Sequence, residues 1–568
     1  MRACLSGLVA LLGALVALLL FLPGPARSEP SQGAPRVSER GAGDASNIDD
    51  STWVDNDRHP IQRPPDWAPD YWGRQFRHGL VEPLSHAFDI PDKILWAAGL
   101  FGARSRREAV NVNAFDEAPN SAWFTNRNHR RSVPVSELRQ GPDSVFLPTK
   151  PWTIKHAKQH GYTFGFQIKD AEGRKWLVKL DPVGYPQLSS GADMISRTLL
   201  HAAGYNVAHN EPVRFRREDL TIDPDLLRGA EGEFFSPANL ESVLVKGAVF
   251  PDGSHSGFAS LFLPDHVLGA SSMDRLRPGD GNDWYEPTNR RELRGLFVLC
   301  SWISDWDTKD QQFLDTFIET RDSLGHTRHY ILDTGSSFGA AARGPKSLPA
   351  SFENTVDFGW TARRFVTLGF VQEPWRRARQ KSGIPSVGNF ESDVYKPQDF
   401  KQLVPHPAFR EMTDRDGYWG AKIVASFSDE QIEAAVAAAN YDEPRASEFI
   451  VRNLIVRRDK IARHWFDRVA PLDFFEVEDG ALRFHDIAVD IGLAPARAYE
   501  VDVEVTGGRD PEDGKVSLRR PAMSLEAFGK SATRLSLRIF IVGNSARPTH
   551  VELTRVGSEW TVTRVKHG

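Results

Sequence analysis

Cysteine is nearly absent from this sequence, since its 568 residues contain only two, Cys4 and Cys300. Cys4 lies in an N-terminal apolar run, and removal of that run would leave Cys300 without a partner in the chain. A disulfide framework like that of small secreted proteins is therefore excluded. Stability must come from buried cores, and a chain of this length is expected to form about two to four domains.

The sequence also has no excess of positive charge. Its formal net charge is −5 and its pI is about 6.4. Surfaces that bind nucleic acid are strongly basic, so we expect no nucleic-acid partner.

Long apolar runs are scarce, and the only one extends from Cys4 to Leu22. Small residues follow it, with Ala26 and Ser28 at positions that suit cleavage by a signal peptidase. Residues 1–28 therefore predict either an export signal or, because a membrane span needs ~20 apolar residues, an uncleaved membrane anchor. We expect a periplasmic or extracellular protein that contacts a membrane only through this segment.

The remaining chain divides into four regions by composition and periodicity. Residues 29–150 predict a disordered tether and then an irregular extension, ordered from near Asp66 and with a helix over Leu80–Leu100. Residues 151–280 read as a small β-rich lobe, residues 281–470 as a helical lobe, and residues 471–568 as a separate β-rich domain. The fold class is therefore α+β.

Each ordered region has elements that can be placed by residue. In the small lobe we expect strands at Tyr162–Ile168, Lys175–Leu180, Tyr205–Phe215 and Ser242–Lys246, and a helix that a capping box at Ser190–Asp193 begins and Gly204 ends. In the helical lobe we expect helices that begin near Asn289, at Ser428 with Gln431 as its capping partner, and at Ser447. In the last domain we expect strands at Tyr499–Val505, Leu535–Val542 and Val551–Val565.

A polar segment inside an apolar stretch is the most informative feature. Asp305–Gln312 precedes a strand-like run, and a second run, Tyr330–Leu332, ends in Asp333–Gly335. A hairpin turn at Ser323–Gly325 can join the two strands. Acids at the ends of neighbouring strands can converge on one ion, and Mg²⁺ prefers carboxylate and amide oxygens. The chain is therefore expected to hold a metal-bound phosphate.

A lysine and two glycines add to this pattern. Lys179 lies in an apolar strand, where an ammonium group needs a partner. Gly161 and Gly165 precede it and permit a close backbone approach. The simpler alternatives are an edge lysine with its head in water, an ordinary turn, and, for Asp193, a helix-capping acid.

Taken in order, these motifs resemble the protein-kinase-like superfamily, and especially its atypical branches: HipA-type kinases, phosphatidylinositol kinases, CotH kinases and secretory-pathway casein kinases. The resemblance covers about residues 150–470. It implies a bilobal fold, with a small antiparallel β lobe carrying one helix and a larger helical lobe.

The resemblance also implies a role for each residue. Asp307 would handle the acceptor hydroxyl, Lys309 would stabilise the transferred charge, and Gln312 and Asp333 would hold Mg²⁺ or Mn²⁺. Lys179 would bind the phosphates of ATP and pair with Asp193, and the loop from Gly161 to Gly165 would cover those phosphates. Asp305 is the alternative catalytic acid. Gln312 replaces the usual Asn, and Asp193 replaces the usual Glu.

Three hypotheses follow. The first is an exported atypical kinase that transfers the ATP γ-phosphoryl group to a hydroxyl of a protein, at Ser or Thr, or of a small molecule. The second is a pseudokinase that binds nucleotide or a partner with little or no turnover. The third is a non-catalytic envelope protein that binds through its C-terminal β domain.

Overall fold

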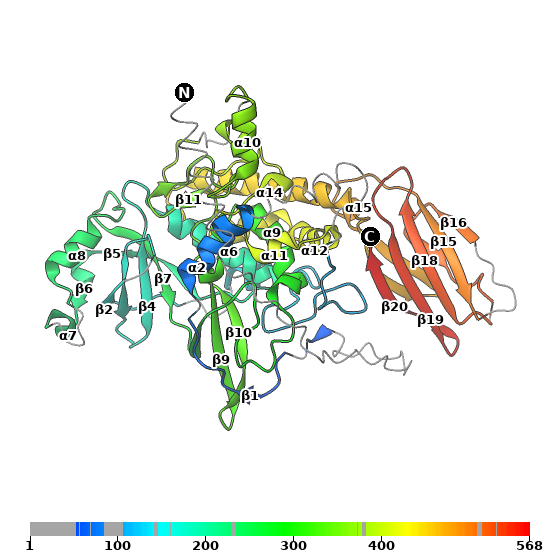
Figure 1. Ribbon diagram of the computed structural model, residues 1–568, viewed down its shortest axis with the longest axis horizontal. Helices are drawn as coiled ribbons and strands as arrows, with labels where there is room; N and C mark the ends of the chain where they lie inside the picture. The colour runs from blue at the N-terminus through cyan, green and yellow to red at the C-terminus, as the bar shows by residue number, and fades with distance from the viewer. Residues whose placement is uncertain are drawn as a thin grey trace, which may run out of the picture. The chain divides into compact units, whose positions relative to one another are not determined.

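The computed structural model describes residues 53–55, 57–68, 70–84, 106–140, 146–158, 161–228, 234–371, 373–377, 382–507, 514–529 and 531–568. The predicted signal at residues 1–28, Cys4, and most of the helix predicted at Leu80–Leu100 lie outside these ranges. Runs of strands and runs of helices follow one another along the described chain, and its strands pair mostly antiparallel, which confirms the α+β class (Figure 1). Within the same ranges, no helix combines the length and the apolar character that a membrane crossing needs.

The small lobe is built on a sheet of six described strands in the order β5-β7-β4-β3-β2-β6. All neighbours are antiparallel except β2 and β6. Trp152, Trp176 and Phe215 belong to its core. The strands are β2 (Trp152–Ala157), β3 (Gly165–Lys169), β4 (Lys175–Leu180), β5 (Asn210–Phe215), β6 (Leu220–Ile222) and β7 (His255–Leu261).

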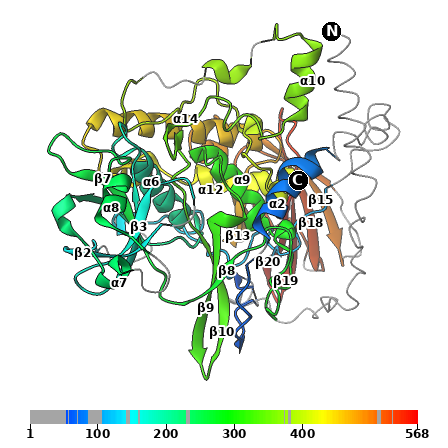
Figure 2. The ribbon, with the colours of Figure 1, turned by 60° about the vertical axis from the view of Figure 1, so that its left-hand side comes forward.

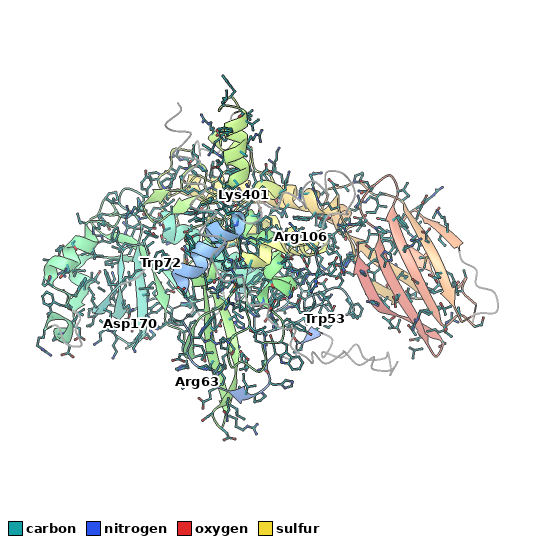
Figure 3. All side chains as sticks on the ribbon, in the orientation of Figure 1. Trp53, Arg63, Trp72, Arg106, Asp170 and Lys401 are labelled. Carbon is teal, nitrogen blue, oxygen red and sulfur yellow. The ribbon has the colours of Figure 1, made fainter. Side chains whose placement is uncertain are left out.

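The turn between β3 and β4 is fixed by one acid. Asp170 accepts hydrogen bonds from the backbone N–H of Glu172 (3.1 Å) and of Arg174 (2.8 Å), and Figure 3 labels it at the end of these strands. The predicted hairpin is confirmed. The strand predicted at Ser242–Lys246 is wrong, because Ser236 caps a helix there, α8 (Pro237–Leu244).

The helix of the small lobe, α6 (Leu188–Ala203), begins before the predicted capping box. Asp181, at the end of β4, accepts hydrogen bonds from the backbone N–H groups of Ser189 and Ser190, each at 2.8 Å. Because this buried carboxylate satisfies the helix N-terminus, Ser190 lies inside the helix and Asp193 does not serve as a capping residue. Gly204 ends the helix as predicted, with φ of 133°.

The helical lobe packs around α9, which contacts α12 and α14. A methyl group on Gly295 of α9 would lie 2.5 Å from the ring of Trp419 of α12, so glycine permits the close approach of these helices. The helices are α9 (Arg291–Ile303), α10 (Phe358–Val366), α11 (Pro407–Arg410), α12 (Asp414–Ala425), α13 (Asp429–Ala437) and α14 (Pro444–Phe466).

All three predicted helix starts in this lobe can be compared with the structure. The helix predicted from Ser447 is α14, which begins earlier, at Pro444. Ser428 and Gln431 form the predicted capping box of α13. Asn289 does not cap α9, because it belongs to a preceding 3₁₀ turn and Arg290 takes the capping position without a side-chain bond. The sequence did not predict α12.

A second sheet, in the order β1-β10-β9-β8, carries the polar segment. Its hairpin of β9 (Phe313–Arg321) and β10 (Leu324–Ile331) is the predicted one and projects from the lobe (Figure 2). β8 (His266–Ala270) pairs with β9 although it lies in the range expected for the small lobe. Ordered structure begins before Asp66, since β1 (Ile61–Gln62) pairs with β10.

The C-terminal region forms two sheets, β13-β14-β17 and β16-β15-β18-β19-β20, around a core of its own. The three predicted strand regions are confirmed, and the last one is the hairpin of β19 and β20. The strands are β13 (Leu472–Glu478), β14 (Ala481–Asp486), β15 (Tyr499–Thr506), β16 (Gly514–Leu518), β17 (Ala522–Ser524), β18 (Arg534–Ile541), β19 (Thr549–Val556) and β20 (Glu559–His567).

Candidate active site

Lys179 lies on β4 directly opposite Gly165 of β3. A side chain at Gly165 would come within 2.0 Å of the carbonyl oxygen of Val178, so the position requires glycine for strand pairing. The Lys179 ammonium is buried and lies 2.9 Å from Oδ1 of Asp333. Lys179 therefore has Asp333 as its carboxylate partner in place of Asp193.

Asp333 follows β10 with a left-handed backbone, φ of 41°. Its side chain is 45% exposed. Desolvation opposes ionisation of this carboxyl, but the adjacent Lys179 ammonium outweighs it and lowers the pKa of Asp333. Asp333 is thus an ionised, accessible carboxylate beside a buried cation.

Asp193 comes from α6 and is completely buried. It accepts hydrogen bonds from the Asn210 side chain (2.5 Å) and from the backbone N–H of Thr334 (3.2 Å). Burial raises the pKa of Asp193, and the charge of Lys179 partly opposes that rise. Asp193 therefore holds the turn that carries Asp333, through Thr334, whose role the sequence did not reveal.

Asp307, Lys309 and Gln312 form a second cluster. The Lys309 ammonium donates to both carboxylate oxygens of Asp307, at 2.7 and 2.9 Å. The Gln312 amide N–H donates to Asp307 at 3.3 Å. Burial raises the pKa of Asp307, Lys309 lowers it, and the negative charge of Asp333 raises it again. The structure thus brings this cluster within electrostatic reach of the Lys179–Asp333 pair.

The other two acids of the loop are mostly buried. Burial, together with the charge of Asp307, raises the pKa of Asp305 to about 8, and its Oδ1 has no hydrogen-bond partner among the described residues. Asp310 Oδ2 lies 2.6 Å from the Arg74 guanidinium. The side chain of Asp307 is 18% exposed, whereas Asp305 is 3% exposed, so Asp307 is the more accessible acid.

The loop between β2 and β3 contains Gly161, whose φ of 83° suits glycine. Lys158 lies in the same loop and donates to the carbonyl oxygen of Thr163 at 2.8 Å. Burial and the charge of nearby Lys179 lower the pKa of Lys158 to about 8, and Asp333 partly opposes this. The loop thus brings a second ammonium toward Lys179. The position of Lys158 in the sequence, directly after a strand and before a glycine loop, is the signal that could have identified it.

The oxygen atoms of this site suit a hard divalent cation. Gln312 is buried and its Oε1 has no hydrogen-bond partner among the described residues, while Asp333 presents an ionised carboxylate. Amide and carboxylate oxygens are ligands of Mg²⁺ and Mn²⁺. The described residues include no group of three or more His, Cys, Asp or Glu side chains that could hold a metal. A cation here would need phosphate oxygens or water as further ligands.

Comparisons with known proteins found similar structures but no similar sequences. The sequence matches no protein-family model and no curated protein. The solved structures to which its structure is similar include two kinases. The proinflammatory kinase CtkA of Helicobacter pylori matches at 10% identity and a TM-score of 0.30, over 56% of this chain and 98% of its own.

Two structures of the Golgi casein kinase are also similar. One matches at 11% identity and a TM-score of 0.28, over 56% of this chain and 71% of that chain. The other, with Mn/ADP bound, matches at 12% identity and a TM-score of 0.28, over 60% and 80% respectively. The roles proposed below therefore depend on the contacts within this chain.

Proposed function

We propose that this protein is an exported ATP-dependent phosphotransferase that acts on a hydroxyl acceptor, with protein Ser or Thr as the first class to test. One observation carries the proposal. A buried lysine paired with an accessible carboxylate, Lys179 with Asp333, lies within electrostatic reach of a second acid held by lysine and amide groups, Asp307. The predicted N-terminal signal supports export.

Each side chain has a task in this scheme. Lys179 and Lys158 bind phosphate oxygens, and Asp193 holds the turn that carries Asp333. Asp307, whose raised pKa suits a general base, takes the proton of the acceptor hydroxyl. The acceptor oxygen then bonds to the γ-phosphorus as the bond from that phosphorus to ADP breaks, and Lys309 stabilises the transferred charge. A cation held by Asp333 and Gln312 would neutralise phosphate charge.

Nucleotide binding and turnover test the proposal in sequence. We expect Mn²⁺ with ATP or ADP to raise the Tm of the full chain, because a ligand that binds only the folded state stabilises it by about 2.7 kcal/mol at 100 times its Kd. Mn²⁺ alone is the control. Transfer of radiolabel from γ-labelled ATP to a protein acceptor is then expected. A Tm that does not respond to nucleotide would rule out both a kinase and a nucleotide-binding pseudokinase.

A pseudokinase is the second candidate, and Gln312 favours it. Its amide N–H donates to Asp307 at 3.3 Å, so part of this side chain is engaged with the base. Binding of Mn²⁺ and nucleotide without transfer to any acceptor would support this candidate over the active kinase.

Lys158→Met is expected to raise the KM for ATP about tenfold, because a hydrogen bond to a charged group contributes about 1.5 kcal/mol or more. The wild-type KM should rise as the pH passes about 8, where Lys158 loses its proton near Lys179 and Asp333. The variant should show no such rise. Lys169→Met, an exposed lysine at the end of β3, is the matched control. Equal KM values for the two variants would contradict a phosphate-binding role.

A further inference from the structure

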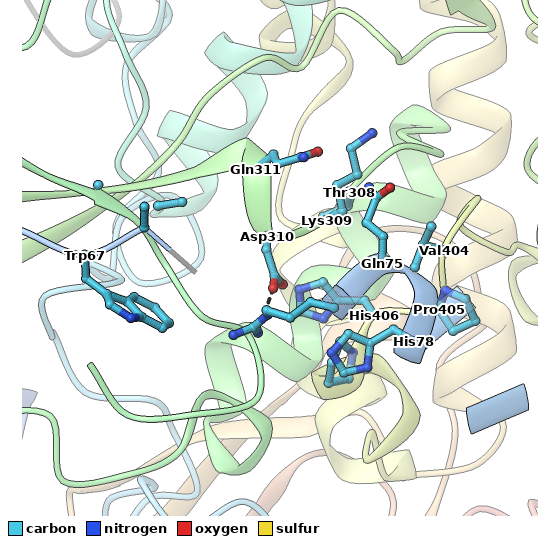
Figure 4. Close-up of a pocket in the computed structure, with 15 residues that line it drawn as sticks. Trp67, Gln75, His78, Thr308, Lys309, Asp310, Gln311, Val404, Pro405 and His406 are labelled. Atoms are coloured by element: carbon cyan, nitrogen blue, oxygen red, sulfur yellow. Dashed lines mark ion pairs between the residues drawn. The ribbon is translucent and has the colours of Figure 1, made fainter. Parts of the chain in front are cut away.

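A cavity of about 200 Å³ has the polar loop as one wall, through the segment from Thr308 to Gln311. Its other walls come from the N-terminal extension between Trp67 and His78, from Gly269 and Ala270 of β8, and from the segment Val404–Pro407 (Figure 4). Lys309 belongs both to this cavity and to the Asp307 cluster. A molecule in the cavity would therefore touch the loop that carries the proposed base.

The walls are mostly apolar, and the charged groups among them are paired. Trp67, Ala68, Val404 and Pro405 contribute apolar surface. The Arg74 guanidinium lies 2.6 Å from Asp310 and 2.6 Å from Asp274. The His78 ring nitrogen lies 3.0 Å from Glu82. Because these charges are balanced within the protein, the cavity favours an uncharged occupant.

One buried side chain in the wall has no hydrogen-bond partner for any of its polar atoms among the described residues. His406 is 2% exposed, and neither ring nitrogen forms a hydrogen bond within the described chain. Its ring is stacked on that of Phe409 with centroids 4.2 Å apart, which fixes its orientation. Burial, with the nearby His78 cation, lowers the pKa of His406 to about 3, so the imidazole is neutral. It offers one donor and one acceptor, and a buried group left unsatisfied costs about 1–3 kcal/mol.

We propose that this cavity binds the phosphoryl acceptor through an uncharged, ring-sized, largely apolar group that bears a hydroxyl, as a phenol does. An apolar cavity of about 150 Å³ accepts benzene, so this cavity has room for a phenol ring. The hydroxyl of that ring satisfies His406, and the hydroxyl to be phosphorylated lies next to the ring in the same molecule. The inference rests on the proposed phosphotransfer function. Such a group comes from a tyrosine next to Ser or Thr, or from a small aromatic alcohol.

The site is tested by measuring the binding of p-cresol to the full-length chain with ligand-observed NMR. We expect saturable binding that Ala68→Trp weakens at least tenfold, because Ala68 is exposed at the cavity and a large ring there would fill it. Ala362→Trp, at an exposed alanine of α10, should have no effect and is the matched control. His406→Leu should weaken binding several-fold by removing the hydrogen bond. The Tm shift with Mn²⁺ and ADP should be the same in all four proteins.

The outcomes separate this inference from the proposed function. No p-cresol binding, or equal binding to the two Trp variants, overturns the cavity proposal even where nucleotide binding and transfer are intact. A second outcome is that the protein binds p-cresol, that Ala68→Trp abolishes this binding, and that the protein transfers no phosphate. This outcome overturns the proposal that the cavity binds a phosphoryl acceptor. Where transfer occurs, Ala68→Trp should lower kcat/KM for the preferred acceptor. Comparing a Ser-Tyr peptide with 4-hydroxybenzyl alcohol then identifies the source of the ring.

Discussion

Asp333→Asn is expected to lower the rate of phosphoryl transfer by about 10²- to 10³-fold, because preorganised charge at the reacting phosphate accounts for effects of this size. Asn keeps the shape of the side chain but removes the ionised carboxylate that pairs with Lys179. The rate is measured with γ-labelled ATP at saturating nucleotide and Mn²⁺. The Tm shift given by Mn²⁺ and ADP should also shrink.

Asp322→Asn is the matched control for this substitution. Asp322 is exposed at the turn of the same β9–β10 hairpin, at the opposite end of these strands from Asp333. Its variant should transfer phosphate at the wild-type rate. The unliganded Tm of both variants shows whether either substitution disturbs folding. If folded Asp333→Asn transfers phosphate at a rate within about threefold of the wild-type rate, Asp333 has no role in transfer. The phosphotransfer proposal would then be wrong.

The sequence predicted the polar loop and its hairpin because their signals are local. Apolar runs that alternate with polar residues form β9 and β10, and a short turn fixes their pairing. The acids at the strand ends are therefore expected to lie near one another, and the charge of Asp333 does reach Asp307, whose pKa it raises. The position of Lys179 could be predicted for the same reason, because it lies in the β3–β4 hairpin, which the local sequence pattern also predicts.

Features that depend on distant parts of the chain were missed or misread. The capping box predicted at Ser190 is not formed, because Asp181, the residue directly after β4, accepts hydrogen bonds from the helix N-terminus. Lys179 pairs with Asp333 through tertiary packing that no local pattern encodes. The cavity joins residues 67–78 to residues 404–407, and only the folded chain brings these segments together. Spacing and periodicity carry no information of this kind.

Asp116 provides a prediction about stability. Its buried carboxylate lies 3.0 Å from Arg291 of α9, 2.6 Å from Arg415 of α12 and 3.2 Å from His567 of β20. One acid therefore ties the N-terminal extension to the helical lobe and to the C-terminal β domain. Asp116→Asn should lower the free energy of unfolding by about 3 kcal/mol or more, because it leaves buried cations without their partner.

The pH dependence of unfolding gives this prediction a second readout. Desolvation opposes ionisation of Asp116, but Arg291, His567 and Arg415 together hold its pKa well below the usual value. A lowered pKa contributes stability that is fully present above about pH 4 and is lost as the pH falls toward the folded-state pKa. The difference between wild type and Asp116→Asn in urea unfolding should therefore be constant near neutral pH and shrink below about pH 4.

Asp502→Asn serves as the control, since Asp502 pairs at 2.9 Å with an Arg538 side chain that is 56% exposed. Exposed ion pairs contribute about 0–1 kcal/mol, so this variant should unfold almost as wild type does.

Hydrogen exchange adds a spatial test, because the backbone N–H of His567 donates directly to Asp116 at 2.9 Å. We expect the amides of β20 to exchange faster in Asp116→Asn than in wild type, because this contact lies on β20. The exchange rates of β16 should not change. Equal unfolding free energies for the Asp116 and Asp502 variants would show that the remaining partners of Arg291 and Arg415, such as Asp416 beside Arg291, are enough to stabilise the two guanidinium groups.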